Sequence, residues 1–188
     1  RLRGAYDGLR ERGLGIVAAQ AAALLARALL AEGRVEEVEA LSHESEALAG
    51  DDLKAAIAWR GVRAEALARR GEHETAIDFA RKGVEIAAAT DGLLDHADAR
   101  LALTVVLRAA GRSEEAQSEE TRAIELWEQK GATLLVERAR QSVARVAQAD
   151  RPPEARVDQP RREPWRVGAN RAIESVARLD AAIAARDA

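Results

Sequence analysis

The residues that could carry out catalysis or bind a metal are few in this 188-residue chain, and they are widely separated. The three histidines, His43, His73 and His96, form no His-Glu-x-x-His pair, and the chain has no cysteine to supply a thiolate ligand. Each of the three lysines is followed by alanine or glycine, not by the serine or threonine of a phosphate-binding loop. We therefore predict no catalytic, cofactor-binding or metal-binding residues, and an enzyme is the least favoured interpretation.

The other side chains with binding chemistry are arginines, carboxylates and one amide that recur at fixed distances before three glycines. Positions thirteen, six and two before Gly33, Gly71 and Gly111 are spaced seven and four residues apart, so they share one face of a helix. The arginines could donate forked hydrogen bonds to carboxylates of a partner. A solvated face without function is the competing interpretation. With Arg108 added beside this face, the predicted partner-binding residues are Gln20, Arg27, Glu65, Arg69, Asp98 and Arg108.

The same three glycines mark corners between helices. The stretches "LAEGRVEEV", "ARRGEHETA" and "RAAGRSEEA" surround them, and glycine just past a helix end favours a left-handed cap. A second series falls between the corners and consists of Gly13, Gly50, Gly92 and Gly131. The two interleaved series predict antiparallel helical hairpins, with residues 1–12 as the end of a preceding hairpin. The predicted helices cover 14–32, 34–49, 53–70, 72–90, 93–110, 112–130 and 132–148.

Hydrophobic positions aligned on the corners predict how these helices pack. Leucine stands four residues before each corner glycine, at Leu29, Leu67 and Leu107, and small residues stand at other fixed distances. Such stripes let two helices approach closely. Eight residues before the glycine, however, Arg63 interrupts the leucine pattern. For the aromatic residues we favour core packing over a recognition role; these are Trp59, Phe79 and Trp127.

Composition narrows the class of protein. Charged residues make up 32% of the chain and aromatic residues 3%, which is typical of a helical protein with an aliphatic core. The net charge of −3 does not favour contact with nucleic acid, and no apolar run approaches the ~20 residues that cross a membrane. The absence of cysteine is compatible with a reducing compartment, and we expect a cytoplasmic location.

The carboxy-terminal part differs from the rest because it holds all four prolines, between residues 152 and 164. Proline lacks the amide hydrogen that a helix needs, so we predict a repeat domain over 1–148 and an irregular linker over 149–168. An amphipathic helix at 169–188 would follow and could begin a further domain. Because the chain contains no methionine, we expect it to be a piece of a longer protein.

A small residue, a leucine, a corner glycine and two later small residues together resemble the tetratricopeptide repeat. The spacing exceeds the ~34 residues of the standard unit, and the usual closing proline is missing. Both departures look like the long-unit, MalT-like variety. Stretches such as "AAQAAALLARALLAEGRVEEVEAL" resemble the carboxy-terminal repeats of bacterial class III adenylate/guanylate cyclase-like proteins, in which a cyclase and an AAA ATPase domain come first.

The resemblance implies a fold and a class of function. The fold is an all-α, right-handed superhelix of antiparallel helical hairpins, with the first helix of each hairpin on the concave side. The function is a non-catalytic interaction or regulatory module that binds a protein partner or a neighbouring domain of its parent chain. The alternative is the effector-sensing repeat segment of a LuxR- or MalT-like transcription regulator.

Overall fold

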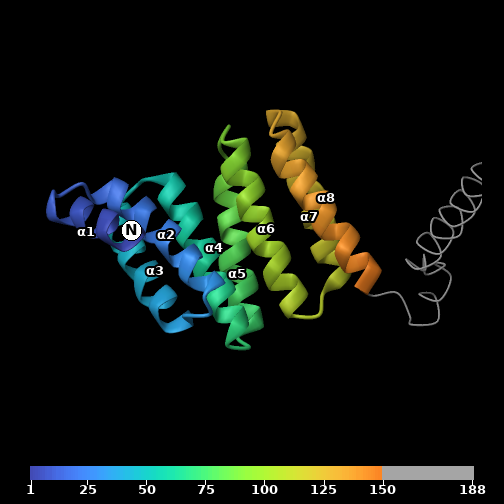
Figure 1. The fold of residues 1–188 in the computed structure, drawn as a ribbon, viewed down its shortest axis with the longest axis horizontal. Helices are drawn as coiled ribbons and strands as arrows, with labels where there is room; N and C mark the ends of the chain where they lie inside the picture. Colours follow the sequence, from blue (N-terminus) through green and yellow to red (C-terminus); the bar gives the residue numbers. More distant parts are fainter. Residues whose placement is uncertain (150–188) are drawn as a thin grey trace, which may run out of the picture. The chain divides into compact units, whose positions relative to one another are not determined.

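The computed structural model describes the backbone of residues 1–149 and the side chains of residues 1–141. The described residues form α-helices that follow one another along the chain (Figure 1). Their bounds agree with the predicted ones to within about two residues, the usual uncertainty of a helix end. From residue 150 onward, the predicted linker and the predicted carboxy-terminal helix lie outside the described residues. The helices are α1 (Leu2–Glu11), α2 (Gly15–Ala31), α3 (Val35–Ala49), α4 (Leu53–Arg69), α5 (His73–Ala88), α6 (Leu93–Ala109), α7 (Ser113–Lys130) and α8 (Thr133–Ala149).

The helices pack in sequential antiparallel pairs within the unit Arg1–Ser142. Helices α2 and α3, α4 and α5, and α6 and α7 form three hairpins, and α1 packs against α2. The first helices of the hairpins also touch one another, because α4 contacts both α2 and α6. Trp127 of α7 packs with Val136 of α8 in one hydrophobic cluster. The predicted all-α array of hairpins is therefore confirmed.

The three hairpin corners share one backbone geometry. The residue after each corner glycine donates its amide hydrogen to the leucine five residues earlier, as Arg34 does to Leu29 over 3.0 Å and Arg112 to Leu107 over 2.9 Å. The corner glycines have positive φ values of 78°, 84° and 74°. This combination is the Schellman cap, which ends a helix with a left-handed residue. The repeated glycine and leucine therefore fix each corner through local backbone chemistry.

Gly92 differs from the other glycines of its series. It has a φ of −75° and stands at the amino-terminal cap of α6, so it does not end a helix in the left-handed conformation. The side chain of Thr90 shapes this connection, since Oγ1 donates to the carbonyl of Ala87 over 2.8 Å and accepts from the amide of Gly92 over 3.2 Å. A hydroxyl side chain thus does here what a left-handed glycine does at the other corners.

Replacement of Gly111 by valine is expected to reduce the free energy of unfolding by roughly 1 kcal/mol or more. The added Cβ would have no heavy neighbour within 4 Å, so the penalty comes from the φ of 74° and not from a clash. Urea denaturation measures the change. The matched control is Gly4→Ala inside α1, where the space is also open and φ is ordinary; it should stabilise by about 0.5–1 kcal/mol. An unchanged midpoint in Gly111→Val would contradict the corner assignment.

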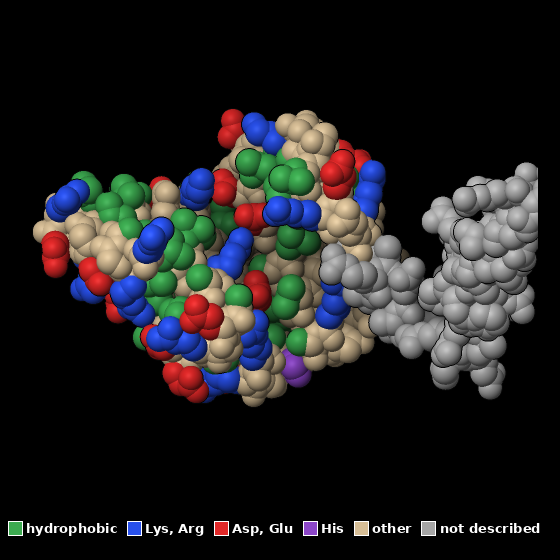
Figure 2. Space-filling model, viewed as in Figure 1, with side chains coloured by type: hydrophobic (Ala, Val, Ile, Leu, Met, Phe, Trp, Pro, Cys, Tyr) green, Lys and Arg blue, Asp and Glu red, His purple; other side chains and the backbone are tan. Residues whose placement is uncertain are grey.

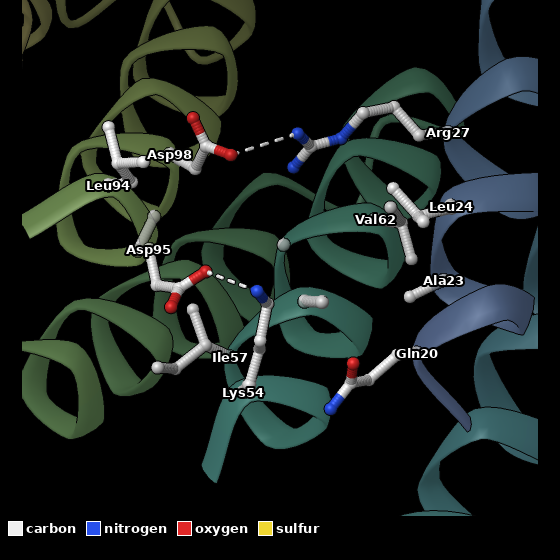
Figure 3. Close-up of a pocket in the computed structure, with 13 residues that line it drawn as sticks. Gln20, Ala23, Leu24, Arg27, Lys54, Ile57, Val62, Leu94, Asp95 and Asp98 are labelled. Atoms are coloured by element: carbon white, nitrogen blue, oxygen red, sulfur yellow. Dashed lines mark hydrogen bonds and ion pairs between the residues drawn. The ribbon is translucent and has the colours of Figure 1, made fainter. Parts of the chain in front are cut away.

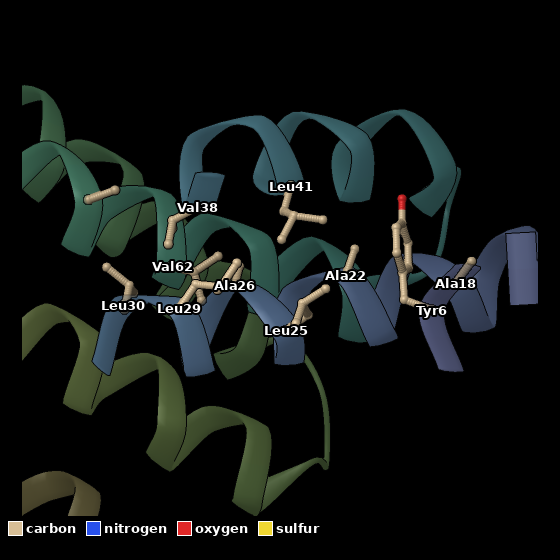
Figure 4. Close-up of a cluster of buried hydrophobic side chains, with 11 residues drawn as sticks. Tyr6, Ala18, Ala22, Leu25, Ala26, Leu29, Leu30, Val38, Leu41 and Val62 are labelled. Atoms are coloured by element: carbon tan, nitrogen blue, oxygen red, sulfur yellow. The ribbon is translucent and has the colours of Figure 1, made fainter. Parts of the chain in front are cut away.

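The core between the hairpins is built from the aligned aliphatic and small residues. Figure 4 shows one cluster, in which Leu25 and Leu29 of α2 meet Leu41 of α3 and Val62 of α4. The small residues at two aligned positions are at most 1% exposed, so facing helices can approach closely there. These residues are Ala26, Ala64 and Thr104, and Val38, Ala76 and Ala116.

Arg63, the residue that interrupts the leucine pattern, is buried, with its side chain 7% exposed. Its guanidinium lies 4.3 Å from the ring centre of Trp59 and 5.4 Å from that of Phe79. Its Nε donates to Ser42 Oγ over 3.0 Å, and its Nη1 donates to Glu46 Oε2 over 2.8 Å. The aromatic faces and the acceptors of α3 together compensate the burial of this charge. Trp59 lies in the core, as the sequence predicts.

Candidate functional site

A groove runs across the first helices of the three hairpins, α2, α4 and α6. It consists of two adjoining hollows, which we call the apolar pocket and the charged pocket, and both are lined by Arg27 and Asp98. The apolar pocket has a volume of about 340 Å³. The face of the molecule in Figure 2 is hollowed near its middle, where hydrophobic, basic and acidic side chains lie next to one another.

The apolar pocket is walled by aliphatic side chains of all three helices. Leu24 of α2 and Leu94 of α6 stand on opposite sides of the opening, and Ile57 and Val62 of α4 lie between them (Figure 3). Gly61 of α4 completes the wall; a Cβ there would lie 3.3 Å from the Cβ of Ala102 on α6. The absence of a side chain at this position therefore lets α4 and α6 approach closely.

Two ion pairs cross the opening of the apolar pocket (Figure 3). Arg27 Nη1 lies 3.5 Å from Asp98 Oδ2, and Lys54 Nζ lies 3.9 Å from Asp95 Oδ1. The side chains of Arg27 and Asp98 are each 46% exposed. Exposed pairs of this kind contribute about 1 kcal/mol or less, so a ligand could displace them at little cost.

Gln20 has a structural role at one end of the groove. Its Nε2 donates to Asp52 Oδ1 over 3.1 Å, and the same oxygen accepts from the amide of Ala55 over 2.7 Å. Asp52 is the amino-terminal cap of α4. Gln20 therefore ties α2 to the beginning of α4, although its side chain also lines the apolar pocket.

The charged pocket contains Glu65 and Arg69 of α4 beside Arg27 and Asp98. Arg69 Nη1 donates to the carbonyl of Leu30 on α2. The carboxylate of Glu65 is half-buried and forms no hydrogen bond or ion pair with any side chain that the structure describes. Burial raises the pKa of Glu65 above its ordinary value, and the nearby charges of Arg27 and Arg69 oppose this only in part. Burial also raises the pKa of Asp98, against the opposing effect of Arg27.

The raised pKa of Glu65 predicts a pH-dependent effect of Glu65→Gln on stability. The folded chain binds a proton at this carboxyl more readily than the unfolded chain, so this group's contribution to stability falls as pH rises through its folded pKa. Removal of the charge should therefore raise the free energy of unfolding near pH 7, and the gain should disappear as the pH falls below about 4.

Urea denaturation at the two pH values measures this effect. The matched control is Glu85→Gln, which replaces an exposed carboxylate that pairs with Lys82 over 2.9 Å on the surface of α5. The control should change stability by no more than about 0.5 kcal/mol at either pH. A loss of stability in Glu65→Gln near neutral pH would show that Glu65 is stabilised as a carboxylate.

The structure brings together five of the six side chains predicted for partner binding. The sixth, Arg108, lines neither pocket and instead donates to Glu120 Oε2 of α7 over 2.6 Å. The lining residues outside the predicted set include Leu24, Lys54, Leu94 and Asp95. Extension of the predicted face by one helical turn, four residues before Ala58 and Asp98, identifies Lys54 and Leu94.

None of the three histidines lines either pocket, and His43 and His96 contact different arginines. His43 Nδ1 is 3.1 Å from the guanidinium of Arg63, and His96 Nε2 accepts from Arg100 Nε over 3.1 Å. Among the described residues, no three acidic or histidine side chains are placed to hold a metal ion. None of the described helices is long and apolar enough to cross a membrane.

The chain was compared with protein-family models, curated proteins and solved structures, and none of them matches it. The fold is therefore established as an array of consecutive helical hairpins, and no family is identified.

Proposed function

We propose that this chain is a non-catalytic protein-interaction module that binds a protein partner, or a neighbouring domain of its parent chain, in the groove. The distribution of exposed large hydrophobic side chains carries this proposal. Among the described residues none of them lies on α3, α5 or α7, the second helices of the hairpins. Leu24, Leu94 and Val105 line the groove itself, and each is at least 41% exposed. Exposed hydrophobic side chains gathered beside polar ones are typical of interaction surfaces.

The repeated corners support a more specific architecture. We infer a tetratricopeptide-like array with long units that winds as a right-handed superhelix, with α2, α4 and α6 on its inner side. The shared Schellman caps and the direct contacts among these three helices favour it. In a cytoplasmic parent protein of the cyclase and ATPase type, binding in the groove would constrain the position of the catalytic domains. Stacked hairpins suit this role because each unit contacts only its neighbours and leaves a continuous surface.

A second candidate function is effector sensing in a transcription regulator of the LuxR or MalT-like kind. The apolar pocket favours it, because a volume of about 340 Å³ with aliphatic walls and a few charged groups at the opening is within the range of small-molecule sites. In this case a small effector, and not a protein segment, would occupy the apolar pocket.

Selection of binding peptides tests the principal proposal. A random peptide library displayed on phage is panned against the full chain and then against Ala58→Trp. Ala58 is half-buried and lines the apolar pocket, so a tryptophan side chain should fill the pocket without entering the core. The matched control is Ala88→Trp, at an exposed position of α5.

We expect the wild-type chain and Ala88→Trp to select the same peptides, and Ala58→Trp to lose them. Circular dichroism must show equal helix content for all three proteins. Peptides that bind Ala58→Trp as well as the wild type would place the interaction outside the groove. The effector-sensing function would be favoured if no peptide is selected and a small molecule binds the wild-type chain but not Ala58→Trp.

A further inference from the structure

Most charged side chains of the groove have a hydrogen-bond or ion-pair partner, but Glu65 does not. Arg27 pairs with Asp98, Lys54 pairs with Asp95, and Arg69 donates to a backbone carbonyl of α2. Glu65 lines the charged pocket beside Arg27, Arg69 and Asp98, and it has no such contact with any described side chain. The array therefore supplies partners for its groove cations and leaves one acidic group available.

We propose that the groove binds a polypeptide segment with a large hydrophobic side chain in the apolar pocket and a lysine or arginine on Glu65. This inference rests on the proposed function, and it names the chemistry of the partner. It differs from the expectation based on sequence alone, in which Arg27 and Arg69 receive carboxylates of the partner.

Charge complementarity favours a basic side chain over an acidic one. A cation that reaches Glu65 also approaches Arg27 and Arg69, but it meets a half-buried carboxylate that bonds to neither arginine, and charge-assisted hydrogen bonds are among the stronger polar contacts. An acidic side chain would meet Arg69, whose guanidinium already donates to the carbonyl of Leu30, and it would approach both Glu65 and Asp98. The raised pKa values of Glu65 and Asp98 agree with this, because the arginines do not fully offset the burial of either carboxyl.

The geometry of α4 sets the distance between the two contacts. Ala58 lines the apolar pocket and Glu65 lines the charged pocket, and the two residues are seven positions apart on one face of the helix. Seven residues of helix rise about 10 Å. A partner helix would present the hydrophobic and basic side chains about seven residues apart, and an extended segment would present them about three residues apart.

The test compares peptides selected by the full chain with those selected by Glu65→Gln. From a random phage-displayed library, the wild type should enrich peptides that combine a large hydrophobic residue with lysine or arginine at one of these spacings. Glu65→Gln should keep the preference for the hydrophobic residue and lose the preference for the basic one. Glu85→Gln, on the outer surface of α5, should select as the wild type does.

A synthetic peptide with the consensus sequence selected by the wild type allows the effect of Glu65→Gln on affinity to be measured. Its affinity for Glu65→Gln should be about tenfold lower, a difference of about 1.4 kcal/mol. The same peptide with norleucine in place of its lysine should bind the wild type and Glu65→Gln equally, which completes a double-mutant cycle.

The outcomes separate this inference from the proposed function. One outcome would overturn the basic-partner inference and leave the groove function intact. In it, the selected peptides carry aspartate or glutamate, and they lose binding both to Ala58→Trp and to Arg69→Gln. The inference would also be overturned if the lysine of the peptide contributes equally to its affinity for the wild type and for Glu65→Gln. Selected peptides that tolerate Ala58→Trp would reject both.

Discussion

Replacement of Trp59 by alanine is expected to reduce the free energy of unfolding by about 3–5 kcal/mol. The ring is 3% exposed and packs among Ala19 of α2, Ala49 at the end of α3, and Phe79 of α5. Its centre lies 6.1 Å from that of Phe79 in an edge-on arrangement. This side chain therefore contacts both of the first two hairpins, and its loss leaves a cavity between four helices.

Urea denaturation followed by circular dichroism measures this loss. Trp59→Phe is the matched variant, because it keeps an aromatic ring beside Phe79 and removes less volume; its loss should be clearly smaller. The expected loss from Trp59→Ala is a large part of the 5–15 kcal/mol that is typical of a whole domain, so an unfolded variant also agrees with the prediction. A loss below about 1 kcal/mol would show that the hairpins do not depend on this contact.

Arg63→Ala is the second change with a large expected effect, a loss of about 2–4 kcal/mol from the lost cation–π contacts, the lost packing and the unpaired polar groups. The substitution removes a buried cation from two aromatic faces and leaves Ser42 Oγ without its donor from α4. Glu46 loses an ion pair at 2.8 Å as well. Arg63→Lys should recover little, because an ammonium group cannot stack on the rings and reach both acceptors with the same geometry.

Arg60 provides a matched control, because it also stacks on the ring of Trp59. Its guanidinium lies 4.1 Å from the ring centre of Trp59, but the side chain is only half-buried and donates to Ala56 of its own helix over 2.9 Å. Arg60→Ala should therefore reduce stability by no more than about 1 kcal/mol. Equal losses in the two variants would mean that burial and the contacts with α3 add nothing to stacking on Trp59.

The groove shows how far sequence periodicity can identify a binding surface. The spacing of seven and four residues places Gln20 and Arg27 on one face of α2, because residues at these distances lie above one another on any helix. It cannot give the partners of these side chains. Arg27 pairs with Asp98, which is 71 residues away in sequence and belongs to another hairpin. That pair depends on how α2, α4 and α6 are arranged side by side.

Arg63 shows the same limit in the core. In sequence it is a charged residue at an aligned leucine position, and the pattern alone gives no reason for the exception. The structure places Trp59 and Phe79 around it and brings Glu46 of α3 within reach. Burial of this charge is tolerated only because groups from three helices meet there.

The helices, their corners and their order as hairpins follow from the amino-acid sequence alone. A Schellman cap depends on the φ of one glycine and on hydrogen bonds within six residues, so the repeated "leucine, then glycine" pattern specifies Gly33, Gly71 and Gly111 as corners without help from the rest of the chain. The pairing of the charges, and the lack of a described partner for Glu65, depend instead on how the helices pack. Those features depend on distances and burial between helices, and a one-dimensional pattern does not contain them.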